Sequence, residues 1–238
     1  MSSEQSLLLR SVKAVYRHLR HGRRIAEQKR ALRSIAGSQG RKIVIGSSGT
    51  APEGWVSTDR EVIDLLQEQS WLHYFEPASL DAILAEHVWE HLSPEDAVRS
   101  AKTCYRFLKP GGYLRAAVPD GLNPDPAYIE QVRPGGTGPG AADHRVLYDH
   151  ASFCKVFALA GFSVRLYEYY DRSGSFRFSE WNPADGMIRR SMRFDERNSA
   201  QRLAYTSIVI DAVKPSEAGA ADASASTLAD EIGRRVRP

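Results

Sequence analysis

The sequence KIVIGSSGTAPEGWVSTD, residues 42–59, decides the fold that we expect for this chain of 238 residues. A short apolar run at residues 43–45 stops at Gly46, a turn rich in glycine and serine follows, and a second strand-like piece at residues 54–58 leads to Asp59. Glycines let the backbone approach a ligand closely, and a carboxylate at the end of the next strand can accept both ribose hydroxyl protons. This order is what a nucleoside-binding α/β domain needs, although a glycine-rich turn alone is more often just a turn.

The composition is that of one globular domain with additional segments at its ends. Hydrophobic residues make up 42% of the chain, which is enough for a sizeable core. The longest apolar runs, such as residues 82–85, are far too short to cross a bilayer, and no apolar signal segment opens the sequence. We therefore expect a cytoplasmic protein without a transmembrane segment. Cys104 and Cys154 form no spaced metal or disulfide framework, so we expect both to be reduced.

The first 40 residues differ from the rest of the chain in charge. Residues 1–36 contain nine Lys or Arg but only Glu4 and Glu27 as acids, and apolar residues recur at helical spacing until Gly37. We expect a basic helical arm whose charges face water. No aromatic stacking set or base-reading motif accompanies these charges, so we expect no specific nucleic-acid binding. Contact with a membrane surface or with an acidic partner through this helix stays open.

Beyond Asp59, strand-like and helix-like segments alternate, which is the pattern of a parallel sheet. Residues 80–85 are a buried-strand run, and Ser93 followed by Pro94 predicts the start of a helix that reaches residue 107. Asp64 closes a third strand or begins a turn. The remaining expected elements are strands at 113–118, 163–170 and 206–213 and a helix at 148–160.

Two polar inserts interrupt this alternation, at residues 119–149 and 171–202. The first is rich in proline and glycine, and a loop of this length is usually a functional lid or disordered. The second mixes aromatic residues with arginines, which suits stacking on sugars or binding an anionic acceptor. A β-hairpin extension or a dimer contact explains the same mixture, because acids are nearly as frequent as arginines there. Residues 215–238 are rich in Ala, Ser and Asp and predict a disordered tail.

Five segments taken together resemble the class I S-adenosylmethionine-dependent methyltransferases: IGSSGT, GWVSTD, LDAILAEHVWEHL, CYRFLKPGGYLRAAVPD and YDHASFCKVFALAGF. Within that class the chain is most similar to the predicted small-molecule or glycan methyltransferases of the type 11 group. The resemblance covers residues 41–214 and leaves the arm, residues 1–40, and the tail outside it. It implies a Rossmann-like α/β fold with a mostly parallel seven-stranded sheet, helices on both faces and an antiparallel final strand at residues 206–213.

The resemblance also implies S-adenosylmethionine as the cofactor. Gly46, Ser47 and Gly49 would lie against its methionine part, and Asp59 would hold the ribose hydroxyls. The loop departs from the family pattern because no third glycine follows Gly49.

Four further residues are assigned to the cofactor on the same ground. Asp64 and Leu65 would lie near the adenine, while Glu86 and His87, which follow the fourth strand of that fold, would line the floor near the sulfonium. With these assignments the resemblance predicts methyl transfer to a small molecule or a glycan, with oxygen as the acceptor atom. A homodimer is left open.

Methyl transfer requires alignment of three atoms in a dry pocket, and a base only when the acceptor is a hydroxyl or a protonated amine. Asp120, His144 and Tyr148 lie in or just after the first insert, where this fold places its acceptor, and are the catalytic candidates. We choose His144 as the base because imidazole titrates near neutrality. The alternative is that His144 caps the following helix or lies on the surface.

Two other functions compete with this interpretation. The sequence HVWEH, residues 87–91, matches the H-x-x-E-H pattern of inverted zinc peptidases. However, Ser93 and Pro94 break the segment after barely one helical turn and no third ligand is evident, so we expect no metal. A methyltransferase-like binding or scaffold protein without catalysis is the other alternative, because the glycine loop is sparse.

Overall fold

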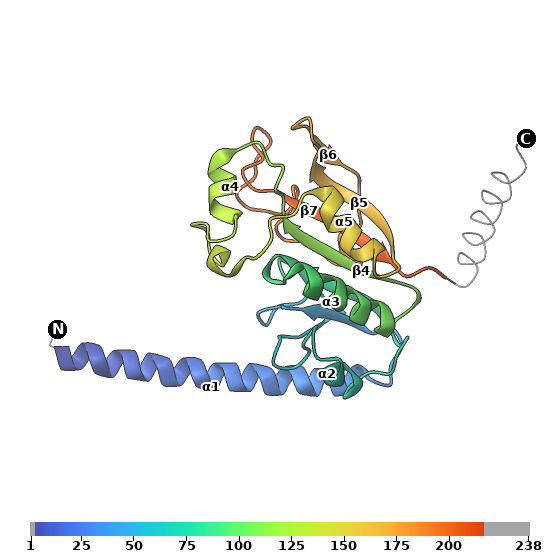
Figure 1. Cartoon of the computed structure of the whole chain (residues 1–238). Helices are drawn as coiled ribbons and strands as arrows, with labels where there is room; N and C mark the ends of the chain where they lie inside the picture. Colours follow the sequence, from blue (N-terminus) through green and yellow to red (C-terminus); the bar gives the residue numbers. More distant parts are fainter. Residues whose placement is uncertain (1–2, 217–238) are drawn as a thin grey trace, which may run out of the picture.

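A seven-stranded mixed sheet forms the centre of the computed structural model, which describes residues 3–216, with side chains from residue 19 onward. The strand order is β2-β1-β3-β4-β7-β5-β6 (Figure 1). The strands are β1 (Lys42–Ile45), β2 (Val56–Ser57), β3 (Leu80–Glu86), β4 (Leu108–Pro119), β5 (Ser163–Tyr170), β6 (Phe176–Phe178) and β7 (Ser207–Val213). Strands β1 to β5 run in one direction, and β6 and β7 run against them. Apart from its first two residues, the predicted tail lies outside the described part.

The helices are placed largely where the sequence predicts them. They are α1 (Ser3–Ile35), α2 (Glu68–Leu72), α3 (Pro94–Phe107), α4 (Pro126–Val132) and α5 (His150–Ala158), with 3-10 turns η1 (Trp89–His91), η2 (Ala141–Asp143) and η3 (Pro183–Asp185). Ser93 Oγ accepts the Asp96 N–H at 3.1 Å, so α3 begins at the predicted cap. Helix α5 begins later than predicted, because Asp149 caps it by accepting the Ser152 N–H at 2.6 Å.

Strand β2 is shorter than the sequence predicts. Only two residues of the predicted piece at 54–58 pair with β1. No strand follows at Asp64, because its carboxylate accepts the Leu66 N–H at 2.8 Å and its carbonyl accepts Trp71 Nε1 at 2.9 Å. These contacts hold Asp64 in a turn. The sheet still has seven strands, because β6, in the second insert, pairs with β5 as a hairpin.

The two faces of the sheet are covered differently. Buried side chains of α1, α2, α3 and α5 pack in one cluster with Ile43, Ile83 and Ile210. On the other face, Trp181 and Ile188 of the second insert pack on Leu84. The α/β architecture is thus as predicted, but this insert covers the second face where helices were expected, because its bulky apolar residues fill that role.

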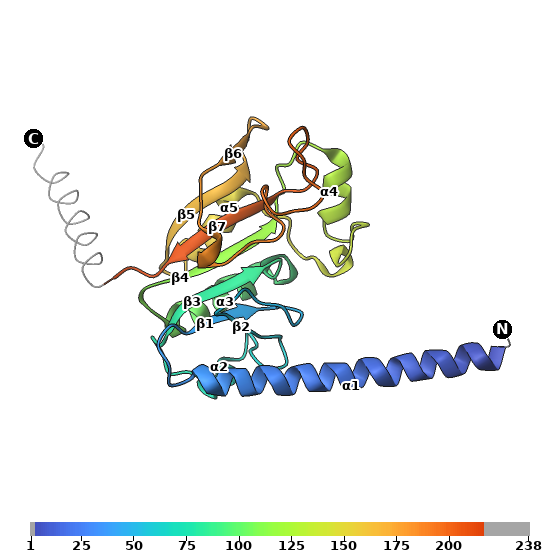
Figure 2. The same ribbon diagram turned by 180° about the vertical axis from the view of Figure 1, so that it is seen from behind.

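Helix α1 lies beside β2 at the end of the sheet and extends well beyond the rest of the molecule (Figures 1 and 2). Its last turns are the part that packs, since Leu32 is fully buried and Gln28 is only 3% exposed. Among the described residues, no helix combines the length and the apolar character that crossing a membrane requires.

A buried ion pair ties the second insert to the sheet. Arg115 of β4 donates to both carboxylate oxygens of Asp211 on the neighbouring β7, at 2.7 and 2.8 Å. The same guanidinium donates to the carbonyls of Asn182 and Gly186 at 2.9 and 3.0 Å and lies over the Trp181 ring. Arg115 is 2% exposed, and each of its three guanidinium nitrogens donates to a protein oxygen.

We expect Arg115→Met to lower the free energy of unfolding by about 3–5 kcal/mol, because it leaves the Asp211 carboxylate buried without its cation. Urea unfolding followed by circular dichroism measures this as a lower midpoint at unchanged slope. The double change Arg115→Met with Asp211→Leu should recover part of the loss. Arg23→Ala, which breaks an exposed pair with Glu27, is the control and should cost less than about 0.5 kcal/mol. Equal effects of Arg115→Met and Arg23→Ala would contradict the conclusion that the buried pair of Arg115 with Asp211 stabilises the fold.

Candidate functional site

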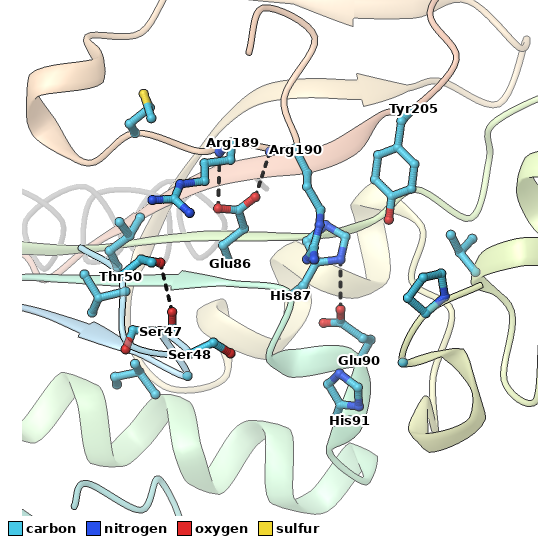
Figure 3. A pocket seen from close by; sticks show the side chains of 18 of the residues that line it. Ser47, Ser48, Thr50, Glu86, His87, Glu90, His91, Arg189, Arg190 and Tyr205 are labelled. Carbon is cyan, nitrogen blue, oxygen red and sulfur yellow. Dashed lines mark hydrogen bonds and ion pairs between the residues drawn. The ribbon is translucent and has the colours of Figure 1, made fainter. Parts of the chain in front are cut away.

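A cavity of about 550 Å³ opens at the carboxyl ends of β1 and β3. Its walls are the loop after β1, the turn after β3, part of the first insert and part of the second insert. Figure 3 shows the side chains that face it, with Ser47 and Thr50 on one side, Glu86 and His87 at the back and Tyr205 opposite. This is the edge at which open α/β sheets bind ligands, because the strands end there and the loops diverge.

The loop after β1 presents backbone to the cavity. Gly46 has a φ of 64°, and a Cβ there would lie 2.8 Å from Val88 Cγ2, so only glycine fits. Thr50 Oγ1 donates to the Ser47 carbonyl at 3.0 Å, and Ser47 Oγ accepts the Gly49 N–H at 3.1 Å. The predicted residues Gly46 and Ser47 line the cavity, whereas Gly49 lies beneath the side chain of Arg24 from α1.

Asp59 lies just outside the cavity and is held by the protein. Its Oδ1 accepts the Ser48 N–H at 2.8 Å, and its Oδ2 accepts Gln28 Nε2 at 3.0 Å. Arg24 Nε lies 3.0 Å from the same Oδ2, and the Asp59 N–H returns a hydrogen bond to Gln28 Oε1 at 3.1 Å. Helix α1 therefore covers the carboxylate that the sequence assigns to the ribose. Asp64 and Leu65, which were assigned to the adenine, also lie away from the cavity wall.

Glu86, at the end of β3, joins the sheet to the second insert. Its two carboxylate oxygens accept the N–H groups of Arg189 and Arg190 at 3.2 and 2.7 Å (Figure 3). The bonds turn residues 187–190 across the mouth of the cavity, where Met187 and both arginines line it. Glu86 therefore lines the cavity, and its charge is shared by two backbone donors.

His87 adopts a φ of 56°, in the left-handed region, and is fixed at both ring nitrogens. Ser207 Oγ donates to the Arg190 carbonyl at 2.7 Å, so it accepts from His87 Nε2 at 3.0 Å. His87 Nδ1 faces Glu90 Oε1 at 3.2 Å, in the ion pair that Figure 3 marks with a dashed line. Burial raises the pKa of Glu90, but the charge and hydrogen bond of His87, a backbone hydrogen bond and the charge of His91 together outweigh burial and hold that pKa below its usual range.

His91 and His144 meet at the inner end of the cavity, although 53 positions separate them in the chain. Their rings lie edge to face with centroids 4.8 Å apart. His144 Nδ1 makes a 2.7 Å hydrogen bond to the Val132 carbonyl, and His144 Nε2 lies 3.9 Å from Glu90 Oε1. His144 therefore neither caps α5 nor lies on the open surface: its side chain is 6% exposed and lines the cavity.

The other two catalytic candidates do not reach the cavity. Asp120 is fully buried, and its oxygens accept the N–H groups of Leu122 and Tyr170 at 3.0 and 2.6 Å. Burial raises the pKa of Asp120 to about 6, against the effect of those hydrogen bonds. Tyr148 is 4% exposed, its pKa is raised to about 12 by burial and by Glu90, and its hydroxyl has no partner among the described residues. Neither side chain lines the cavity wall.

The cavity also contains residues that were not assigned to the site from the sequence. Arg197 lies 3.6 Å from the centroid of the Tyr205 ring and pairs with Asp195. Arg189 and Arg190 complete the group. The arginine-rich composition of the second insert was the signal for them, but it did not indicate which of its arginines face the site.

Comparison with known proteins was made at the level of family and structure. A family described as "Methyltransferase domain" matches residues 55–116, which run from β2 into β4. No curated protein matches the chain.

Solved structures with a similar fold are all remote in sequence. A methyltransferase of Thermotoga maritima, described as a possible histamine N-methyltransferase, is 16% identical, with 86% of this chain and 96% of that chain covered and a TM-score of 0.45. A methyltransferase of Archaeoglobus fulgidus is 15% identical, with 80% and 94% covered and a TM-score of 0.42. One from Mesorhizobium loti is 12% identical, with 77% and 96% covered and a TM-score of 0.43. These similarities are too weak to bear on activity.

The family match and the sheet agree with each other. The matched segment contains β3 and α3, and the reversed strand β7 lies between β4 and β5, as the antiparallel final strand of the predicted fold requires. The cavity lies at the carboxyl ends of β1 and β3, beside the glycine loop. The match to a methyltransferase domain thus covers residues 55–116, and the sheet around them has the α/β fold that the sequence resemblance implies.

Proposed function

We propose that the chain is an S-adenosylmethionine-dependent methyltransferase that methylates an oxygen atom of a small molecule or of a glycan end, which enters the cavity between the two inserts. One observation carries the proposal: a single cavity contains both the glycine loop after β1 and the free imidazole of His144. Its volume of about 550 Å³ lies in the range of small-molecule sites.

The β1 side of the cavity fits the methionine half of the cofactor. Gly46 has no side chain, so the loop offers backbone at close range, and Ser47 and Thr50 add hydroxyl groups. Bound S-adenosylmethionine supplies a methyl group on a cationic sulfur. Glu86 offers negative charge on the floor of the same region.

The ribose assignment requires a local exchange of partners. Asp59 Oδ2 now accepts from Gln28 and lies beside Arg24. Ribose hydroxyls would take the place of these two α1 side chains on the carboxylate. Arg24 is 38% exposed, so water can solvate it once it is released.

We expect Asp59→Ala to weaken S-adenosylhomocysteine binding at least about tenfold, through the loss of two hydrogen bonds to a charged acceptor. Calorimetric titration measures this. Arg24→Ala is the matched control, because it uncovers Asp59 and should leave affinity unchanged or raise it by up to about fivefold. Binding by Asp59→Ala that equals that of the parent would show that the ribose lies elsewhere.

The inner end of the cavity is where we place the acceptor. His144 Nδ1 donates to a backbone carbonyl, so its Nε2 carries the lone pair that can take the proton of an acceptor hydroxyl. Glu90, at 3.9 Å from Nε2, would stabilise the imidazolium that results. Residues of the first insert, among them Gln131, Val132 and Gly138, also line this cavity.

We expect His144→Ala to lower kcat by about 10²- to 10⁴-fold while S-adenosylhomocysteine affinity stays within about twofold, since the residue acts on the acceptor and not on the cofactor. The measurement is turnover with an acceptor found by screening hydroxyl compounds, together with titration of the product cofactor. His150→Ala is the control, as His150 bonds the Tyr170 carbonyl outside the cavity. Unchanged turnover in His144→Ala would remove His144 from the mechanism.

The charge of the cavity favours an acceptor that carries an anionic group. Arg189 and Arg190 line it, and within the described residues neither guanidinium forms an ion pair. By contrast, Arg193 and Arg177 of the same insert pair with Glu180 and Asp171. An unpaired guanidinium in a concave site is suited to a carboxylate or a phosphate.

We expect Arg189→Ala with Arg190→Ala to raise KM for the acceptor at least about tenfold, with little change for uncharged analogues, because an ion pair to the acceptor is lost. Initial rates over acceptor concentration measure the effect. The control replaces Arg177 and Arg193, whose partners are acids of the insert itself, and should not alter KM. Equal KM values in both double variants would contradict an anionic acceptor.

A further inference from the structure

We propose that Glu90, His91 and His144 bind a divalent transition-metal ion, zinc foremost, at the inner end of the cavity. One ligand atom of each residue lies within 4.8 Å of those of the other two. The three come from different parts of the chain: η1 after β3 supplies Glu90 and His91, and the first insert supplies His144.

Each of the two histidines has one ring nitrogen that bonds a backbone carbonyl. His91 Nδ1 bonds the Asp143 carbonyl at 3.3 Å, and His144 Nδ1 bonds the Val132 carbonyl at 2.7 Å. A carbonyl oxygen only accepts, so each Nδ1 carries the ring proton and each Nε2 keeps its lone pair. Metal-binding histidines are held in this way, with the second nitrogen donating to a carbonyl or a carboxylate.

Glu90 provides a second, independent indication of an ion at this point. The residue is 1% exposed, and its Oε1 faces both His87 Nδ1, at 3.2 Å, and His144 Nε2, at 3.9 Å. In the part of the chain that the structure describes, its Oε2 has no hydrogen-bond donor. A buried carboxylate with so few donors is costly, and a cation beside it would lower that cost.

The donor set and its spacing select the class of ion. Two imidazole nitrogens and one carboxylate oxygen suit zinc and its transition-metal neighbours, whereas Ca²⁺ and Mg²⁺ prefer oxygen alone. With bonds of about 2.1 Å, ligand atoms on a tetrahedral ion stand about 3.4 Å apart. His144 Nε2 and Glu90 Oε1 are 3.9 Å apart, so a movement of about half an ångström brings this pair into place.

This ligand set differs from the one that the H-x-x-E-H pattern predicts. The pattern pairs His87 with His91, but His87 Nε2 bonds Ser207 and its Nδ1 faces Glu90. His87 therefore orients the carboxylate and does not bind the ion. His144, 57 positions from His87 in the sequence, takes its place.

An ion with three protein ligands keeps an open position. If the proposed acceptor site is correct, an acceptor hydroxyl binds there, and the ion lowers the pKa of that hydroxyl so that its O–H bond breaks with the proton passing to water and the electron pair staying on oxygen. In that state His144 Nε2 is a ligand, and the ion performs the activation that the imidazole performs without it. Metal binding itself does not depend on the proposed acceptor.

The test is titration of the chelator-treated full chain, without a polyhistidine tag, with Zn²⁺ by calorimetry, and with Co²⁺ by visible absorption. We expect one ion per chain and cobalt bands of a four-coordinate site. His91→Ala should weaken binding at least about a hundredfold and abolish those bands, because it removes a ligand from the more exposed side of the cluster. Glu90→Gln, which keeps the shape of the buried side chain, should weaken it comparably.

His73→Ala is the matched control, since His73 is exposed just after α2 and contacts only the neighbouring Tyr74 among aromatic rings. It should bind Zn²⁺ as the parent does. Unchanged affinity in His91→Ala and Glu90→Gln, or less than about 0.2 ion per chain in the parent, would overturn the proposal. Binding of S-adenosylhomocysteine, measured in parallel, separates this outcome from a failure of the methyltransferase assignment.

Discussion

The contact between Arg115 and Asp211 connects the parts of the molecule on which the cavity depends. It joins β4 to β7 inside the sheet, and the same guanidinium holds two carbonyls of the second insert. The insert then continues across the sheet face and delivers its N–H groups to Glu86, which closes one side of the cavity. Arg115 is buried, so breaking its pair with Asp211 would leave an unpaired charge inside the protein. This cost holds the second insert in place more firmly than its loop-like sequence suggests.

The sequence predicted those parts of the fold that are encoded locally. The cap at Ser93 predicted the start of α3, and apolar runs bounded by turn residues predicted β3, β5 and β7 closely. The run at 113–118 predicted only the second half of β4, which begins at residue 108. It did not predict contacts between distant positions, because periodicity describes one element at a time. Arg115 pairs with Asp211, which is 96 positions away in the sequence, and neither residue type is expected in a buried strand. The aromatic residues of the second insert were likewise visible, but only the fold shows that they cover a sheet face.

Some of the residues that were assigned to the site from the sequence line the cavity, and others do not. Residues that follow strand ends directly, Gly46, Glu86 and His87, do line the cavity, because the ends of parallel strands share an edge. Asp59 also follows a strand, but Gln28 and Arg24 reach it from a helix that precedes the sheet. The basic arm thus has a specific polar contact with the domain in addition to its buried Leu32. Composition alone predicted only a solvated basic face, since which side of a helix packs depends on its partner.

The electrostatics of the cavity suit the chemistry of a sulfonium cofactor. A bare carboxylate beside a cationic sulfur would stabilise the bound cofactor more than the transition state, in which that positive charge fades. Glu86 shares its charge with two backbone N–H groups, and Glu90 faces His87, so neither acts as a bare anion. Arg189 and Arg190 add guanidinium groups that form no ion pair with the described residues. In the proposed function these groups would attract an anionic acceptor, while the partnered carboxylates would not hold a cationic cofactor so tightly that its reaction is slowed.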